Sequence, residues 1–146
     1  MAAFIIRALY GENFSYTTKP YFSDVPSDNS FFKYIQMLKD VGITSVTGTY
    51  GINENVTRGQ MAAFIIRALY GQYQLNANGW PTSSENFSYK TAAYFTDVPS
   101  TNAYFKYVQK LKDVGITSVS GNYGVDNVVT RDQMAAFLGR AFLGMP

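Results

Sequence analysis

One eleven-residue block occurs twice unchanged along this chain and a third time in altered form, and the repetition limits the folds that the chain can adopt. The block MAAFIIRALYG fills residues 1–11 and, unchanged, residues 61–71, while MAAFLGRAFLG fills residues 134–144. Residues 12–60 also align without a gap to residues 85–133, with about two-thirds of the positions identical. Such repetition is typical of proteins in which each supersecondary unit buries its apolar face against a neighbouring unit.

The alignment divides the chain into one partial and two complete repeats. The partial repeat spans residues 1–16 and holds only a second helix, so on this division the chain starts inside a repeat. The complete repeats span residues 17–71 and 85–146. Between them lie residues 72–84, which have no counterpart elsewhere in the chain and which we expect to form an inserted loop.

Apolar periodicity predicts that each complete repeat consists of a helix, a loop and a second helix. In the first helix of each repeat, apolar side chains recur at the spacing of one helical face. They are Phe31, Tyr34, Ile35, Leu38 and Val41, and then Tyr104, Tyr107, Val108, Leu111 and Val114. The predicted helices span about residues 1–10, 28–41, 57–70, 101–114 and 130–143. We expect a mainly α fold of tandem helix-loop-helix repeats, with Gly/Thr/Asn-rich loops and little or no β-structure.

Capping signals mark the ends of these helices. For the first helices, the candidate N-caps are Ser27 or Asp28 and Ser100 or Thr101. Gly42 and Gly115 supply the C-terminal stops. The second helices each begin with a capping box, formed by Thr57 with Gln60 and by Thr130 with Gln133.

The composition excludes several classes of function. The 146 residues contain no Cys and no His, which excludes disulfides, thiolate nucleophiles, Cys/His zinc sites and histidine acid–base catalysis. The ten carboxylates form no evident close pair, so we expect no enzyme activity, no cofactor and no metal site. With 12 basic residues and no basic run, nothing indicates nucleic acid as a partner. No apolar run is long enough to span a membrane, and these residues contain no export signal.

Two further kinds of residue could carry binding. Asp24 and Asp97 could belong to calcium loops, but their neighbours offer few carboxylate ligands, so capping of the turns before Pro26 and Pro99 is the favoured interpretation. Trp80, in the inserted segment, could stack on a sugar ring. The aromatic residues at helical spacing are expected in the core.

Three motifs, in the same order in both repeats, resemble those of S-layer homology (SLH) domains. They are FSDVP and FTDVP before the first helix, LKDVGITS at its end, and VTRGQMAAFIIRAL and VTRDQMAAFLGRAF at the second helix. The resemblance implies a non-catalytic, extracellular module at the bacterial cell surface. It also implies that the repeats associate through their first helices and bind cell-wall polysaccharide in the grooves between them.

The same resemblance assigns glycan contacts to the arginine of the Thr-Arg motif, here Arg58 and Arg131. These arginines could clamp an acidic sugar through bidentate hydrogen bonds. Alternatively, they are ordinary surface residues in a first helical turn, where a cation opposes the helix dipole. In place of the family's His-Trp pair the chain has Asn29-Ser30 and Asn102-Ala103, and in place of its acidic residue after Thr-Arg it has Gln60 and Gln133.

We weigh three functional hypotheses. The first is a structural protein that self-assembles into an extracellular layer or filament, as a homo-oligomer or polymer. Its assembly face would be the apolar stripe of the first predicted helix, namely Phe4, Ile5, Ala8 and Leu9, which lacks a first helix of its own repeat. The second is a cell-wall polysaccharide-binding anchor, although an anchor normally carries a cargo domain and we expect none in residues 1–146. The third is a helical interaction module without a particular cell surface.

Overall fold

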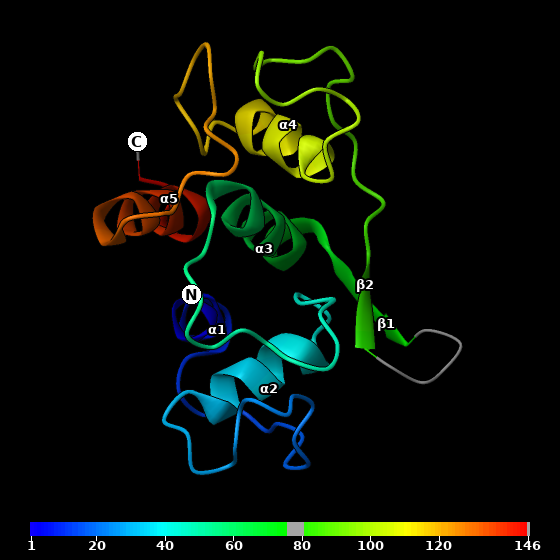
Figure 1. Ribbon diagram of the computed structural model, residues 1–146, viewed down its shortest axis with the longest axis vertical. Coiled ribbons are helices and arrows are strands. Elements are labelled where there is room, and N and C mark those ends of the chain that lie inside the picture. Colours follow the sequence, from blue (N-terminus) through cyan, green and yellow to red (C-terminus); the bar gives the residue numbers. More distant parts are fainter. Residues whose placement is uncertain (76–80, 146) are drawn as a thin grey trace. The chain divides into compact units, whose positions relative to one another are not determined.

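The computed structural model of the chain describes residues 1–75 and 81–145, and for residues 72–75 and 81–84 it describes the backbone alone. Its helices are α1 (Ala2–Tyr10), α2 (Phe32–Asp40), α3 (Arg58–Tyr70), α4 (Phe105–Asp113) and α5 (Arg131–Leu143). Its strands are β1 (Gln72–Leu75) and β2 (Pro81–Ser84) (Figure 1). The mainly α fold that the sequence predicts is confirmed.

Both first helices begin four residues later than the sequence predicts, because asparagine side chains hold a turn ahead of them. Asn29 Oδ1 accepts the N–H of Phe31 at 2.8 Å, and Asn102 Oδ1 accepts the N–H of Tyr104 at 2.8 Å. Phe31 and Tyr104 are the N-caps of α2 and α4, and neither makes a side-chain capping bond. The N-caps predicted at residues 27–28 are therefore wrong, as are those at the equivalent positions before α4. A local Asn-to-backbone bond competes with helix there.

Glycine ends both first helices, as the sequence predicts. Gly42 has a φ of 72°, in the left-handed region that an L side chain rarely adopts. Its N–H donates to Lys39 O at 2.9 Å, and the N–H of Ile43 donates to Leu38 O at 3.0 Å. This pair of bonds is a Schellman motif, which satisfies two carbonyls at the end of α2. Gly115, with a φ of 75°, ends α4 in the same way.

The apolar face predicted for the first helices is buried at its centre and open at its ends. The buried side chains on it are Tyr34, Ile35 and Leu38 in α2 and Tyr107, Val108 and Leu111 in α4. Phe31 and Val114, at the ends of the predicted faces, are 52% and 36% exposed. Each helix buries Phe32 or Phe105 in addition, which the periodicity did not include.

The buried face of α1 is not the one that the sequence predicts. Ala2, Ala3, Ile5 and Ile6 are buried, whereas Phe4 is 54% exposed. Ala8 is also exposed and Leu9 is half-buried. Two stripes of this short helix satisfy the i, i+3, i+4 spacing, and the one through Ile6 is the buried one. Of the four predicted assembly residues, only Ile5 is therefore fully buried.

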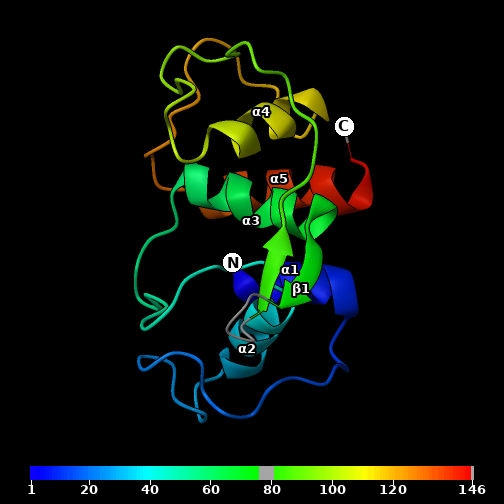
Figure 2. The same ribbon diagram turned by 90° about the vertical axis from the view of Figure 1, so that its right-hand side faces the viewer.

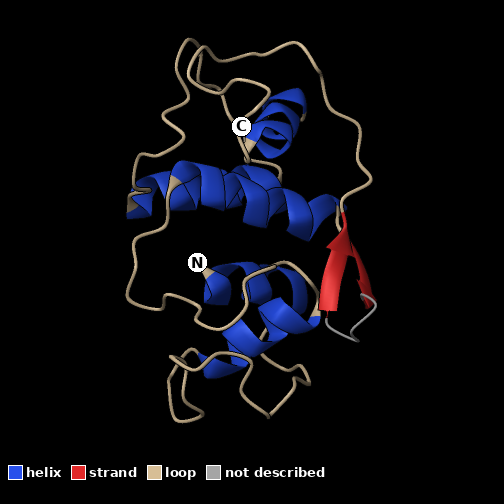
Figure 3. Ribbon diagram, turned by 45° about the vertical axis from the view of Figure 1, so that its right-hand side comes forward, coloured by secondary structure: helices blue, strands red, loops and turns tan. Residues whose placement is uncertain are grey.

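The described ends of the inserted segment, residues 72–75 and 81–84, form two strands. β1 and β2 pair antiparallel, from Gln72 opposite Ser84 to Leu75 opposite Pro81, and Figure 3 draws the two strands in red. The expectation of a loop at residues 72–84 is wrong to that extent. Trp80 lies outside the described residues.

The chain divides into two compact units whose boundaries cross the sequence repeats. Unit 1 comprises Met1–Glu54 and Tyr70–Glu85, and unit 2 comprises Asn55–Leu69 and Asn86–Pro146. Within unit 1, α1 packs on α2, although the two helices come from different repeats (Figures 1 and 2). The second helix of one repeat thus packs with the first helix of the next.

Candidate functional site

Arg58 is the first residue of α3, and its position is fixed by the capping box before it. Thr57 Oγ1 accepts the N–H of Gln60 at 3.2 Å, and Gln60 Oε1 accepts the N–H of Thr57 at 2.9 Å. This reciprocal pair satisfies two donors that a helix start leaves open. α5 starts in the same way, with a capping box between Thr130 and Gln133.

The guanidinium of Arg58 is held among aromatic rings in unit 2. Its Nε donates to Tyr123 O at 2.8 Å, and the Tyr123 ring centroid is 4.6 Å from its Cζ. The ring of Phe137, from α5, is 5.5 Å away. Burial raises the pKa of Tyr123, although the nearby Arg58 charge opposes that rise. Because Arg58 is only 8% exposed, the interpretation of it as an ordinary surface arginine is wrong.

Gly59 lets the start of α3 approach the loop of the following repeat closely. The N–H of Gly59 donates to Val125 O at 2.9 Å, and the N–H of Arg58 donates to Asn127 O at 2.9 Å. A Cβ built on Gly59 would lie 2.6 Å from Tyr104 Cδ2 and 2.8 Å from Val125 Cγ2. These distances are far inside van der Waals contact, so the close approach requires glycine.

Arg131 occupies the same motif position as Arg58 but has a different environment. It is exposed, at the first turn of α5. The next residue is Asp132, where α3 has Gly59. The sequence treats the two arginines alike, whereas one is packed between rings and the other is open to solvent.

Asp24 and Asp97 fix the glycine-rich loops by accepting hydrogen bonds from backbone N–H groups of those loops. Asp24 accepts the N–H groups of Tyr50 at 2.7 Å and Gly51 at 2.8 Å, and these bonds lower the pKa of its carboxyl. Asp97 makes the same bonds to Tyr123 and its neighbour at 2.7 and 2.6 Å. Burial raises the pKa of Asp97, but the backbone bonds outweigh it.

These bonds decide how the two aspartates act. Each carboxylate reaches a loop 26 residues further along the chain, so the favoured interpretation of local turn capping missed the main partners. Among the described residues, no three Asp or Glu side chains gather as metal ligands.

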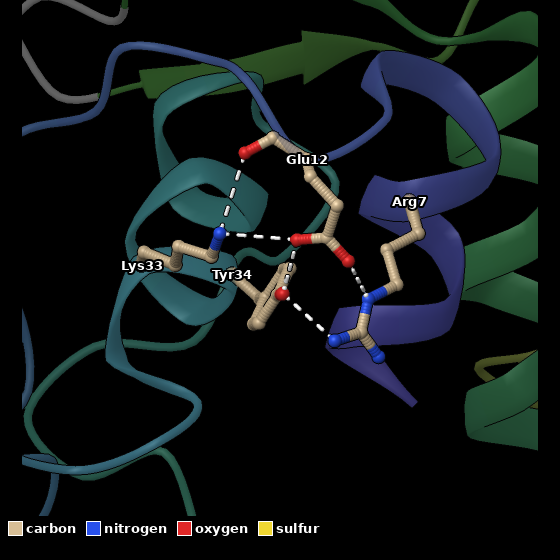
Figure 4. A network of polar contacts seen from close by, with 4 residues as sticks. All are labelled: Arg7, Glu12, Lys33 and Tyr34. Carbon is tan, nitrogen blue, oxygen red and sulfur yellow. Dashed lines mark hydrogen bonds and ion pairs between the residues drawn. The ribbon is translucent and has the colours of Figure 1, made fainter.

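A polar network that the sequence did not predict joins the end of α1 to α2 (Figure 4). Glu12 accepts hydrogen bonds from Tyr34 OH at 2.6 Å and Lys33 Nζ at 3.1 Å, and it forms an ion pair with Arg7. Together these contacts, that from Tyr34 the strongest, lower the pKa of Glu12 to about 2. Arg7 Nη2 also donates to Tyr34 OH at 2.8 Å, and in unit 2 Arg67 makes the equivalent bond at 2.7 Å. The sequence feature that indicates this network is the arginine at the same position of every eleven-residue block.

A buried glutamine in each first helix was also missed. Gln36 donates through Nε2 to Thr17 O at 2.6 Å and to Lys19 O at 2.8 Å, and it accepts from the N–H of Tyr21 at 3.2 Å. Gln109 makes the equivalent bonds in unit 2. The glutamines hold the segment that enters each first helix.

No helix in the described part of the chain is long and apolar enough to cross a membrane.

Comparison with known proteins places these features in a family. The family model of the S-layer homology domain matches residues 21–62 and 94–135, which together make up more than half of the chain. The chain is also 27% identical over 146 residues to an endoglucanase of Bacillus sp. (strain KSM-635), covering 97% of this chain and 14% of that protein. The chain thus spans about one-seventh of the length of that relative. The two matched segments each run from the Phe-x-Asp-Val-Pro motif to the first turn of α3 or α5, and the chain belongs to the S-layer homology domain family.

Proposed function

We propose that this chain is a non-catalytic module that binds cell-wall polysaccharide and anchors a protein at the outer surface of a bacterial cell. Membership of the S-layer homology family supports this function. The similarity to an endoglucanase supports it as well, because the chain corresponds to only 14% of that protein. In that relative, the part that matches this chain is short beside the rest of the protein, as is expected where an anchor is attached to a cargo enzyme.

The observation that carries the proposal is the restrained guanidinium of Arg58. Its Nε is engaged with Tyr123 O, and aromatic rings lie near its planar group at 4.6 and 5.5 Å. An arginine whose orientation is fixed before binding loses little side-chain entropy when it hydrogen-bonds a planar anionic group. The exposed Arg131 offers the same fork of donors to solvent. Acidic substituents of a polysaccharide are the ligand groups that such arginines recognise best.

Self-assembly into a filament has less support, because α5 differs from α3 where packing is tightest. α5 has Asp132 at the position of Gly59, where any Cβ would collide with Tyr104 and Val125 of the receiving surface. It also has Gly139 in place of the fully buried Ile66. A second copy could not pack on α5 as α4 packs on α3 without rearrangement. The anchor therefore replaces the filament as the main proposal.

The proposal is tested by co-sedimentation with purified cell walls of a Bacillus species. We expect the chain to sediment with intact walls and to remain in solution when the wall polysaccharide has been extracted. Arg131→Lys should weaken binding several-fold without changing the melting temperature, because lysine cannot form bidentate bonds. Arg140→Lys, on the same helix but outside the Thr-Arg motif, is the matched control and should bind as the parent chain does.

Arg58→Lys requires a stability measurement beside the binding assay, because the substitution also removes the bond to Tyr123 O. We expect weaker wall binding at a temperature well below the melting transition of the variant. The proposal fails if the parent chain ignores intact walls at low salt, or if it binds extracted walls equally well.

A further inference from the structure

One backbone peptide group in unit 2, between Tyr123 and Gly124, is hydrogen-bonded on both sides by charged side chains. Its carbonyl oxygen, Tyr123 O, accepts from Arg58 Nε at 2.8 Å. Its N–H, on Gly124, donates to Asp97 Oδ2 at 2.6 Å. Because a peptide group is planar, a carboxylate that fixes the N–H also fixes the direction in which the carbonyl points. A single rigid group thus lies between the carboxylate of Asp97 and the guanidinium of Arg58.

Asp97 also holds the other side of Tyr123. Its Oδ1 accepts the N–H of Tyr123 at 2.7 Å, so one carboxylate bonds both peptide groups that flank the Tyr123 Cα. The side chain of Tyr123 is oriented as well. Its ring centroid is 4.6 Å from Arg58 Cζ and 5.2 Å from that of Phe95, and its OH donates to Arg58 O at 3.3 Å. Tyr123 therefore contacts Arg58 with its ring, its hydroxyl group and its carbonyl group.

The charge of Asp97 favours the same arrangement. Burial raises the pKa of Asp97, but the backbone bonds outweigh it, so the pKa is lowered and the carboxyl group is ionised at neutral pH. A hydrogen bond to an ionised carboxylate polarises the peptide group that donates it, and the carbonyl of that group becomes a better acceptor. The bonds thus run from an anion through a polarised peptide group to the cation of Arg58.

The terminal amino groups of Arg58 remain available to a ligand. Among the described residues, the bond to Tyr123 O is the only hydrogen bond that the Arg58 side chain donates, and no buried side-chain nitrogen lacks a partner. The two Nη groups of Arg58 therefore reach solvent, although the residue is only 8% exposed. A guanidinium held at Nε and between rings presents both groups to an anion in one direction.

We propose that Asp97 is a positioning residue for Arg58. Through the Tyr123–Gly124 peptide group it fixes the plane of the guanidinium, and so the direction in which the two Nη groups meet an acidic group of the polysaccharide. This inference rests on the proposed anchoring function, to which it adds a residue that acts only through the loop. Arg58 belongs to the first repeat and Asp97 to the second, so the binding arginine of one repeat depends on the Phe-x-Asp-Val-Pro motif of the next.

Asp97→Asn tests the inference with a side chain of nearly the same size. An asparagine accepts through one oxygen only, so one of the two loop N–H groups would face an NH2 group. Asp24→Asn is the matched control. Asp24 makes the same bonds in unit 1, at 2.7 and 2.8 Å, whereas Arg58 and Tyr123 belong to unit 2. Both variants should lose similar stability, and only Asp97→Asn should affect Arg58.

The readout is the NMR signal of the Arg58 Nε–H group in the full chain without polysaccharide, and Arg58→Lys identifies this signal by its loss. In Asp97→Asn we expect the signal to shift and its hydrogen exchange to become about tenfold faster, because the bond to Tyr123 O opens more often. Sedimentation with intact cell walls should be several-fold weaker. In Asp24→Asn the signal, its exchange and wall binding should equal those of the parent chain.

Three results would overturn the proposal. One is an unchanged Arg58 signal in folded Asp97→Asn, another is an equal change in Asp24→Asn, and the third is a changed signal with undiminished wall binding. If Asp97→Asn does not fold, a pH titration of the parent chain decides instead. The Arg58 signal should then move with the same midpoint as the Asp97 carboxyl carbon, and a signal that does not respond at that midpoint overturns the proposal.

The NMR measurement needs no polysaccharide, so the two proposals fail separately. A parent chain that ignores intact walls would refute the anchor, whereas the Arg58 signal alone decides whether Asp97 orients the guanidinium.

Discussion

Gly59→Ala tests the close approach on which the Arg58 site depends. In a helix without tertiary crowding this substitution stabilises a protein by about 0.5–1 kcal/mol, because alanine loses less backbone entropy than glycine. At Gly59 the added methyl group would meet Tyr104 Cδ2 at 2.6 Å and Val125 Cγ2 at 2.8 Å. Overpacking of this kind typically costs about 1–3 kcal/mol. We therefore expect a net loss of about 1 kcal/mol, because the difference between the two effects runs from about 0 to 2.5 kcal/mol.

Urea unfolding followed by circular dichroism measures this loss, and thermal melting should fall by about 2–4 °C for each kcal/mol. A double-mutant cycle with Tyr104→Ala supplies the control. Removal of that ring removes the nearest collision, so Gly59→Ala should cost less in the Tyr104→Ala background. If Gly59→Ala stabilises the chain, or costs the same in both backgrounds, the close packing of α3 on the loop is not what fixes Arg58.

Three further predictions concern polar groups. Thr57→Ala and Thr130→Ala should each cost about 1 kcal/mol, since each removes an N-cap, and unchanged melting would contradict the capping boxes. The lowered pKa of Asp24 means that its bonds stabilise the fold above its ordinary value near 3.8 and stop doing so as pH falls through the lower folded value. Asp24→Asn should therefore reduce the difference in unfolding free energy between pH 7 and pH 2. An unchanged difference would show that the bonds from Asp24 to the loop do not stabilise the fold. The Glu12 carboxyl, whose pKa is lowered most by the hydrogen bond from Tyr34, should titrate near 2 by carbon NMR. A midpoint above 4 would exclude the network that joins Glu12 to Tyr34, Lys33 and Arg7.

The features predicted correctly from the sequence depend on local signals. Five helices were visible because apolar spacing, Thr-x-x-Gln boxes and Gly42 act within a few residues. The late start of α2 was missed for a local reason as well. The side chain of Asn29 competes for the backbone, because its Oδ1 accepts the N–H of Phe31 and holds a turn where the helix would otherwise begin.

The environment of the two arginines could not be read from local signals. Arg58 is buried through Tyr123, which lies 65 residues away, and through the ring of Phe137 on another helix. Apart from Asp132, the motif around Arg131 contains no residue that predicts the exposure of Arg131. Asp132 replaces the glycine found at position 59, and the importance of that difference depends on the contacts of Gly59 with Tyr104 and Val125, which are distant in the sequence.

The thirteen-residue insertion leaves unchanged the contact between the second helix of one repeat and the first helix of the next. Arg7 and Tyr34 are 27 residues apart, and Arg67 and Tyr107 are 40 apart. The difference equals the 13 residues of the insertion at residues 72–84. The two bonds nevertheless have nearly the same length, 2.8 and 2.7 Å. Extra chain between two packed helices costs only the entropy of a longer loop, which grows slowly with length. The contact between the second helix of one repeat and the first helix of the next therefore sets the geometry, and the segment between them is free to vary.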